Sequence, residues 1–242
     1  FLPAIDQWQI LVAVLAVLTM TVGNVVAIAQ HNFKRLLAYS SIGHVGFMLV
    51  GIASMSVIGV ESLLFYIVAY GVTTLTVFIG LIAFFNVTGR DDIADLGGLA
   101  DRHPFLAAAI AVGLFSLAGL PFFAGFTAKF YLFAAAGVEG LLWLAGFAIF
   151  NSLISLYYYL MIVRRMYIDP VPDWAKEGND VTRNLSEQDK ADDMSGVSAP
   201  SLAPSRLITG LLAVLVLGVI VVGVYPFPIM SAVKSAAAAI FA

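Results

Sequence analysis

The chain has 242 residues, of which 61% are hydrophobic and 11% charged, and its formal net charge is -3. This composition excludes a soluble globular domain, and the acidic balance excludes a basic surface for nucleic acid. Because the chain has no cysteine, it forms no disulfide and ligates no iron–sulfur cluster through thiolates. Several apolar stretches exceed the roughly 18 residues typical of a spanning helix, so we expect an all-α polytopic membrane protein.

The apolar runs predict about six transmembrane helices, the fourth of them discontinuous. In chain order they cover about 8–29, 36–55, 62–85, the interrupted 104–136, 141–168, and a last run from after Arg206 to about 225. In this topology all lysines and arginines except Lys129 and Lys234 fall on one side, which the positive-inside rule makes cytoplasmic. Both ends of the chain are then expected on the other side.

Three regions follow from these runs. Residues 1–168 hold five spans, and 206–242 hold the last span and a short outer tail, which we expect to be an interfacial or peripheral helix. Residues 169–205 are rich in Asp, Glu, Ser and Pro, a composition that buries too little surface to offset its ordering entropy. They predict a flexible or partner-held cytoplasmic loop, with a small ordered unit as the alternative. Because the chain opens on Phe1 rather than methionine, we expect a fragment of a longer subunit.

The fourth run is too long for one straight helix. Its length would span about 50 Å, against about 30 Å for the hydrocarbon core of a bilayer. Gly119, Pro121 and Gly125 are expected to break it, because proline removes an internal hydrogen bond and glycine weakens the neighbouring turns. Irregular backbone at membrane depth survives only where protein buries it or where it lines a wet cavity, so the break indicates a transport path.

Lys129 lies ten residues before Glu139, or about 15 Å along a helix, which is close to the midplane. A lysine there costs about 3 kcal/mol. We expect Thr127 to cap the second half-helix, whose positive end joins the low dielectric in disfavouring the ammonium form. Lys129 is therefore a candidate proton-exchanging group. The alternative is a permanent cation paired with a carboxylate or with carbonyls of the first half-helix.

His44 is the second candidate. It lies about 13 Å along its helix from Arg35, and imidazole gains or loses a proton near physiological pH. Ser40 shares its face one turn earlier. The alternative is a histidine that only hydrogen-bonds across a helix interface.

Further hydroxyl groups at mid-depth are expected to support a polar path between the two candidates. They are Ser40, Tyr70, Thr127, Tyr131 and Ser152. Aromatic residues at helical spacing more often serve packing, so packing remains the alternative for the tyrosines. His31 and His103 lie in loops without a partner at metal-ligand spacing, so no metal site is expected.

Three stretches resemble a known family. Residues 32–47, NFKRLLAYSSIGHVGF, resemble a signature of the antiporter-like membrane subunits of NADH:quinone oxidoreductase (respiratory complex I, NDH-1). Residues 116–131, SLAGLPFFAGFTAKFY, resemble the signature of their broken twelfth helix, and residues 151–160 are similar to the helix after it in subunit N. A lysine rather than a glutamate at 129 suits subunit N better than subunit M.

The resemblance implies a Mrp-type, antiporter-like fold of fourteen helices, of which this chain is the C-terminal half. It also implies a proton-translocating membrane-arm subunit of the translocase, which couples quinone reduction elsewhere to proton transfer through Lys129 with help from His44. Phe122 replaces the usual second proline of the break and Ala128 replaces the glycine before the lysine, so the break could be stiffer or differently shaped.

The same resemblance implies the partners and the location. The partners would be the antiporter-like M and L subunits and the small K, J and A-type subunits of the membrane arm. NADH, FMN, iron–sulfur clusters and quinone are expected in other subunits, and no cofactor is expected in this chain. The expected location is the bacterial plasma membrane, with an organellar inner or thylakoid membrane as the alternative. A subunit of a multi-component Na+/H+ antiporter or membrane-bound hydrogenase, and a non-pumping scaffold, are the alternative functions.

Overall fold

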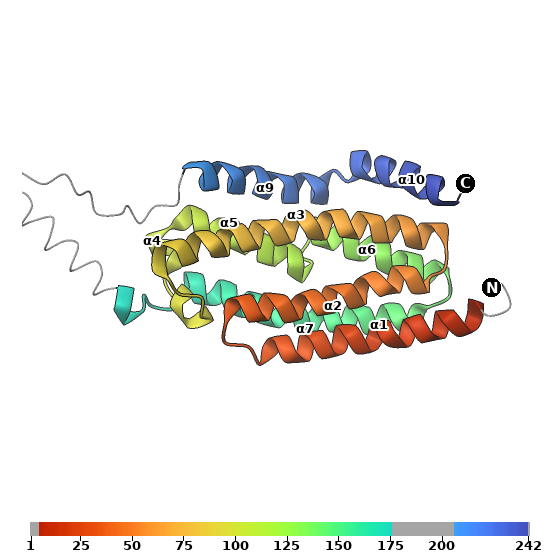
Figure 1. The fold of residues 1–242 in the computed structure, drawn as a ribbon, viewed down its shortest axis with the longest axis horizontal. Helices are drawn as coiled ribbons and strands as arrows, with labels where there is room; N and C mark the ends of the chain where they lie inside the picture. Colours follow the sequence, from red (N-terminus) through yellow and green to blue (C-terminus); the bar gives the residue numbers. More distant parts are fainter. Residues whose placement is uncertain (1–4, 176–205, 242) are drawn as a thin grey trace, which may run out of the picture.

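The helices lie side by side along the long axis of the molecule (Figure 1). A computed structural model describes residues 5–175 and 206–241. The helices in chain order are α1 (Ile5–Ile28), α2 (Phe33–Ala53), α3 (Val57–Thr88), the 3-10 helix η2 (Ile93–Leu96), α4 (Leu99–Arg102), α5 (Pro104–Ala118), α6 (Ala124–Val138), α7 (Leu142–Tyr167), α9 (Arg206–Val224) and α10 (Phe227–Phe241).

The lengths of these helices fit a polytopic membrane protein. Among the described residues, five helices are long and apolar enough to cross a membrane, namely α1, α2, α3, α7 and α9. The two shorter apolar helices α5 and α6 follow one another along the bundle (Figure 1), so together they make one further crossing. The predicted all-α fold with a discontinuous fourth span is therefore confirmed.

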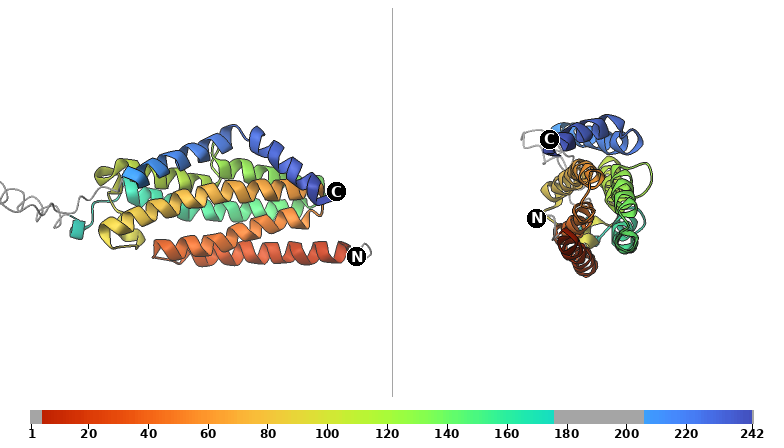
Figure 2. Two further views of the ribbon diagram at one scale, coloured as in Figure 1. Left: turned by 45° about the horizontal axis from the view of Figure 1, so that its top comes forward. Right: turned by 90° about the vertical axis from the view of Figure 1, so that its right-hand side faces the viewer.

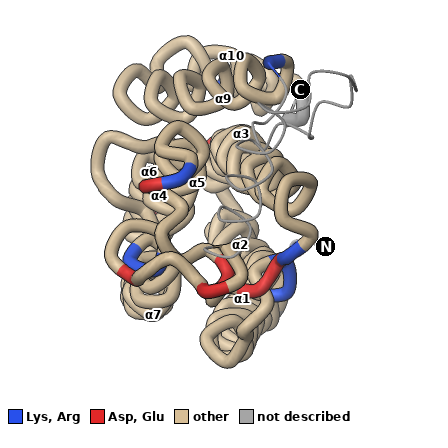
Figure 3. The backbone as a smooth tube through the Cα atoms, turned by 90° about the vertical axis from the view of Figure 1, so that its left-hand side faces the viewer, with Lys and Arg blue, Asp and Glu red and all other residues tan. Residues whose placement is uncertain are grey.

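Most charged residues of the described part of the chain lie at the end of the bundle where α2 and α5 begin and α3 and α7 end (Figure 3). Two loops meet there, since the amide of Phe33 donates to the carbonyl of Asp91 at 2.8 Å and Lys34 pairs with the Asp91 carboxylate at 3.1 Å. Lys234 belongs to α10, the helix at the opposite end of the molecule (Figure 1). This distribution agrees with the side that the basic residues predict.

α1 and α2 pack closely through glycines. A Cβ atom on Gly23 would overlap the backbone of Gly43, and one on Gly46 would overlap Met20 of α1. Close approach of backbones is how helices associate in lipid, where the hydrophobic effect does not drive them together. The pair α1 and α2 therefore forms a unit that carries His44.

The C-terminal region covers one face of the bundle. α9 packs on α3, α5 and α6. α10 turns away from α9 at an angle (Figure 2) and packs on α3, and its Val233 and Ala237 are buried. The outer tail is thus a helix from residue 227 onward. Of the loop predicted at 169–205, residues 176–205 lie outside the described residues. Before them, Trp174 donates from Nε1 to Asp95 at 2.8 Å, which holds this described stretch against η2.

Candidate functional site

The break between α5 and α6 begins at Gly119. This residue has φ of 86°, a left-handed conformation that glycine adopts without strain, and it ends α5 as the C-cap. Its amide donates to the carbonyls of Phe115 and Ser116, and the amide of Leu120 also donates to Phe115. The carbonyls of residues 117 and 118, the last in α5, are left available for another donor.

Lys129 is that donor. Its Nζ donates to the carbonyl oxygens of Leu117 at 3.0 Å and Ala118 at 3.1 Å, and to Oγ of Ser152 on α7 at 2.9 Å. The side chain is 4% exposed and lies 5.0 Å from the ring centroid of Phe47. No carboxylate forms an ion pair with it among residues 5–175 and 206–241. The amine is therefore held by the negative end of a helix dipole and by a hydroxyl.

These three acceptors suit two protonation states. An ammonium has three N–H donors, and three oxygens receive them here. A neutral amine has two N–H donors and a lone pair, so the two carbonyls keep their hydrogen bonds and the hydroxyl of Ser152 turns to donate. Among the three partners only Ser152 can reverse its role, which makes it the group that follows the charge of Lys129.

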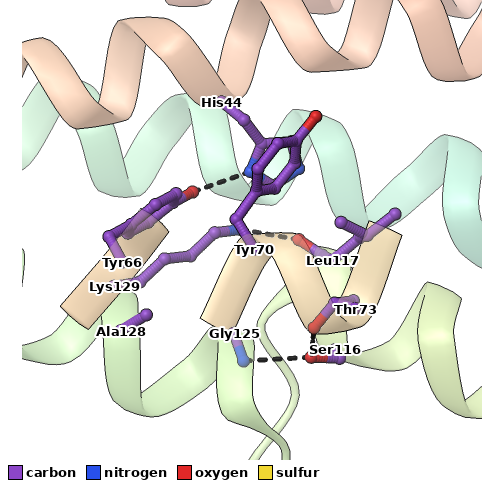
Figure 4. Close-up of a pocket in the computed structure, with 9 residues that line it drawn as sticks. All are labelled: His44, Tyr66, Tyr70, Thr73, Ser116, Leu117, Gly125, Ala128 and Lys129. Carbon is purple, nitrogen blue, oxygen red and sulfur yellow. Dashed lines mark hydrogen bonds between the residues drawn. The ribbon is translucent and has the colours of Figure 1, made fainter. Parts of the chain in front are cut away.

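The backbone that positions Lys129 is fixed by a chain of hydrogen bonds across the break. The amide of Gly125 donates to Ser116 Oγ at 3.0 Å, Ser116 and Thr73 lie 2.9 Å apart, and Thr73 donates to the Ala69 carbonyl at 2.7 Å (Figure 4). A Cβ atom on Gly125 would overlap the Ser116 carbonyl. The start of α6 therefore touches the end of α5, and both are tied to α3.

His44 lies on the other side of the site, between two tyrosines. Its Nδ1 lies 2.7 Å from the hydroxyl of Tyr66 and its Nε2 lies 3.2 Å from that of Tyr159, while the ring of Tyr70 lies 4.8 Å from the imidazole centroid. A neutral imidazole donates to one of these oxygens and accepts from the other, and an imidazolium donates to both. This arrangement lets a proton enter at one nitrogen and leave from the other.

A small cavity joins the two groups (Figure 4). It encloses about 10 Å³, close to the space that one water molecule needs. The residues that surround it are His44, Tyr66, Tyr70, Thr73, Ser116, Leu117, Gly125, Ala128 and Lys129. The cavity wall is mainly apolar, but the residues around it carry hydroxyl, imidazole and amine groups, the kinds of partner that a buried water requires.

The structure brings most of the candidate residues together. Lys129, His44 and Tyr70 surround the cavity, and Ser152 bonds Lys129 from α7. Ser40 is buried beside them on α2, where its Oγ donates to the carbonyl of Leu37. Gly119 and Gly125 bound the break, and Pro121 lies within it.

Two of the supporting hydroxyls lie elsewhere. The prediction that Thr127 caps α6 is wrong, because α6 begins at Ala124 after the extended Phe123, and Thr127 donates to the carbonyl of Gly223 on α9 at 2.9 Å. Tyr131 does not border the cavity, and its ring packs against Phe65 at 5.6 Å between centroids. Fewer of the predicted hydroxyl groups therefore lie near Lys129 and His44 than the sequence suggests.

The sequence reasoning did not select four residues that the site uses: Tyr66, Thr73, Ser116 and Tyr159. A signal was present for Tyr66, which lies one helical turn before Tyr70. A signal was also present for Tyr159, one of three successive tyrosines at 157–159 that could order water between His44 and Lys129. Nothing local indicated Thr73 and Ser116, since their role depends on which helix they face. Among the described residues no group of three or more His, Asp or Glu could hold a metal ion.

A bundle of apolar spans, one of them interrupted, with a buried lysine bonded to the end of the interrupted helix, defines an antiporter-like, multi-pass membrane protein. The chain belongs to the family of NADH:quinone oxidoreductase/Mrp antiporter transmembrane regions, whose model matches residues 1–155. The resemblance found in residues 32–47 and 116–131 is thereby confirmed.

Similar proteins agree with this membership. The chain is 37% identical over 237 residues to NADH-quinone oxidoreductase subunit N of Moorella thermoacetica, covering 97% of this chain and 44% of that protein. It is 45% identical over 169 residues to subunit N of Rhodospirillum rubrum, covering 68% and 34%. The chain thus spans less than half the length of these relatives.

Solved structures show the same fold. A chain of respiratory complex I from Thermus thermophilus with bound NADH superposes with a TM-score of 0.75 at 26% identity, covering 97% of this chain and 44% of that one. The Mrp complex from Dietzia sp. gives a TM-score of 0.78 at 22% identity, covering 96% and 47%, and at that identity it shows the fold alone.

Proposed function

We propose that this chain is the C-terminal half of subunit N of a proton-pumping NADH:quinone oxidoreductase and that it moves protons through Lys129. The observation that carries the proposal is the setting of Lys129. Its amine is buried without a carboxylate partner among the described residues, and it shares a water-sized cavity with His44. The identity to subunit N relatives over 97% of the chain supports the choice of complex.

The side chains suggest how a proton passes. A neutral Lys129 amine accepts a proton from a water in the cavity, and the new ammonium is stabilised by the carbonyls of Leu117 and Ala118. The imidazolium of His44 returns a proton to that water through the hydroxyl of Tyr66 and becomes neutral, and its other nitrogen can then be protonated again. Discharge returns Lys129 to the amine, and Ser152 then donates to it.

The driving force comes from outside this chain in the proposal. Quinone reduction elsewhere changes charge and hydration along the membrane arm, so that Lys129 loads from one side and discharges outward. Antiporter-like M and L subunits and small K, J and A-type subunits are the proposed partners. NADH, FMN, iron–sulfur clusters and quinone would bind other subunits, and the bacterial plasma membrane is the proposed location.

A second candidate keeps the fold and changes the complex. A subunit of a multi-component Na+/H+ antiporter is favoured by the similarity to the Mrp complex, although that match rests on 22% identity. Isolation of the assembly from its native membrane separates the two, because copurifying redox subunits support the first proposal and their absence supports the second.

Replacement of Lys129 tests the function itself. We expect Lys129→Ala in the intact complex to lower the number of protons moved per electron while electron transfer continues. Lys234→Ala is the matched control, since Lys234 is exposed in α10 and far from the cavity. Unchanged pumping in Lys129→Ala would mean that the lysine is an inert cation of a scaffold, because its carbonyl contacts alone fit that role as well.

A further inference from the structure

A second group of buried polar side chains lies between α1 and α7, outside the cavity. Tyr158 Oη donates to Asn24 Oδ1 at 2.9 Å, and Asn24 Nδ2 donates to the carbonyl and to Oδ1 of Asn151 at 3.2 and 3.4 Å. Asn151 Nδ2 donates to Thr21 Oγ1 at 3.3 Å and to the carbonyl of Phe147 at 3.0 Å. Asn24 and Asn151 are each 1% exposed and Tyr158 is fully buried. Polar groups this deep in a membrane protein are costly unless bonded, and these are bonded.

The placement of this group on α7 relates it to the site. Asn151 and Tyr158 are seven residues apart, nearly two helical turns, so they share one face. Ser152 and Tyr159 form the neighbouring stripe, offset by about 100°. One stripe faces Asn24 of α1, and the other delivers Ser152 to Lys129 and Tyr159 to His44.

The rotation of α7 about its own axis therefore decides both contacts. At the outer surface of a helix, about 5 to 6 Å from its axis, a roll of about 20° moves an atom by roughly 2 Å, and the motion is larger for the longer tyrosine side chain. Such a shift would break hydrogen bonds that are 2.9 and 3.2 Å long at Ser152 and Tyr159. The apolar outer face of α7 supplies no comparable directional contact, because lipid is as apolar as the side chains it meets.

We propose that Asn24, Asn151 and Tyr158 are positioning residues that lock the rotation of α7 so that Ser152 and Tyr159 meet Lys129 and His44. α1 contributes no residue to the cavity among the described residues, yet it is joined to α2, the helix of His44, through Gly23 and Gly43. Figure 1 shows α1, α2 and α7 running side by side. These hydrogen bonds thus fix the rotation of α7 relative to α1 and, through α1, relative to α2, which carries His44. The inference rests on the proposed proton transfer through Lys129.

Two variants in the intact complex test the lock. Asn24→Leu keeps the approximate size and removes the carboxamide, and Tyr158→Phe removes one hydroxyl. Because a misplacement of about 1 Å in a reacting group costs up to about a hundredfold, we expect each to lower the pumping rate by roughly tenfold. Val25→Leu is the matched control, since the neighbouring Val25 side chain is 55% exposed. The double variant should lose little more than either single one, because both changes break one network.

A distance measurement separates positioning from mere stability. Spin labels on non-canonical amino acids at the exposed Ile42 of α2 and Phe150 of α7 report the rotation of α7. We expect the distance distribution to shift or broaden in Asn24→Leu and Tyr158→Phe and to stay unchanged in Val25→Leu. If Asn24→Leu prevents assembly, the pumping rate and the distance distribution of Tyr158→Phe alone test the proposal.

The outcomes distinguish the two proposals. A shifted distance with reduced pumping supports the lock, while either change without the other overturns it. If Lys129→Ala leaves pumping intact, the proposed function fails whatever the distances show. If Lys129→Ala abolishes pumping and both lock variants behave like wild type, only the lock fails.

Discussion

The charged end of the bundle and the break at its centre hold their cations by different means. At the charged end Lys34 lies 3.1 Å from the carboxylate of Asp91, with 41% of its side chain exposed, and 3.7 Å from the ring centroid of Phe85. At the break Lys129 is 4% exposed, and its partners are two carbonyls and a hydroxyl. If Lys34 loses its partner, bulk water and dissolved counterions can replace it, whereas Lys129 is buried away from bulk solvent.

The two sites therefore differ in how much they depend on one charge. Exposed ion pairs contribute about 0 to 1 kcal/mol and are screened by salt, so the charged end fixes loops without depending on any one charge. Unlike a carboxylate, a backbone carbonyl does not take up a proton at physiological pH. Among Lys129 and its three hydrogen-bond partners, only Lys129 therefore changes its charge. A site of the second kind suits proton transfer, so substitutions at the break should affect pumping more than substitutions at the charged end.

Gly125→Val should have the largest effect. A side chain there would overlap the Ser116 carbonyl and force α5 and α6 apart, and overpacking of this kind typically costs about 1 to 3 kcal/mol. We expect a loss of assembled complex, measured by native gel electrophoresis of solubilised membranes. Gly71→Ala is the control, because nothing lies within 4 Å of a Cβ atom at that position. Full assembly of Gly125→Val would contradict the close contact of the two half-helices.

Ser152→Ala should come next. It removes one of three acceptors from Lys129, and hydrogen bonds to charged groups contribute about 1.5 to 3 kcal/mol. We expect pumping to fall by roughly tenfold or more with assembly intact, measured as acidification by membrane vesicles. Ser235→Ala is the control, since the exposed Ser235 hydroxyl bonds the Ser231 carbonyl of its own helix, and Ser235 does not line the cavity. Pumping equal to that of the control would show that the hydroxyl does not follow the charge of Lys129.

Tyr66→Phe should lower pumping less than Ser152→Ala does. Its effect should still exceed that of Tyr159→Phe. The hydroxyl of Tyr66 lies 2.7 Å from His44, against 3.2 Å for that of Tyr159, and a neutral hydrogen bond contributes about 1 kcal/mol. We expect a reduction in pumping of roughly fivefold for Tyr66→Phe. Vesicle acidification at equal complex content measures both variants, and the reverse order would indicate that the path leaves His44 through α7.

Lys34→Ala should have the smallest effect. The lost pair with Asp91 is half exposed, so the change in unfolding free energy is expected to be below about 1 kcal/mol and to shrink at high salt. Thermal unfolding of the purified complex at two salt concentrations measures it, with pumping assayed alongside. A large loss of pumping in Lys34→Ala would remove the distinction between the charged end and the break.

Features that depend on local chemistry or on the length of a segment follow from the residues alone. Runs of apolar residues specify the spans because the bilayer sets the length of a helix. Gly119 and Pro121 specify the break because each changes the backbone at its own position. Lys129 is recognisable as a buried cation because it lies in the middle of an apolar run. If that run spans the membrane, its central residues lie far from both surfaces.

Which side chains meet depends on how the helices pack, and local sequence does not show it. Thr127 looks like a helix cap in sequence, but its hydroxyl bonds Gly223, a residue far along the chain. Tyr159 faces His44 and Tyr158 faces Asn24 because of the rotation of α7. In a membrane the apolar pattern does not set this rotation, since lipid and neighbouring helices are equally apolar. Contacts between polar groups that are far apart in the sequence set the rotation instead. These contacts exist only once the helices have packed.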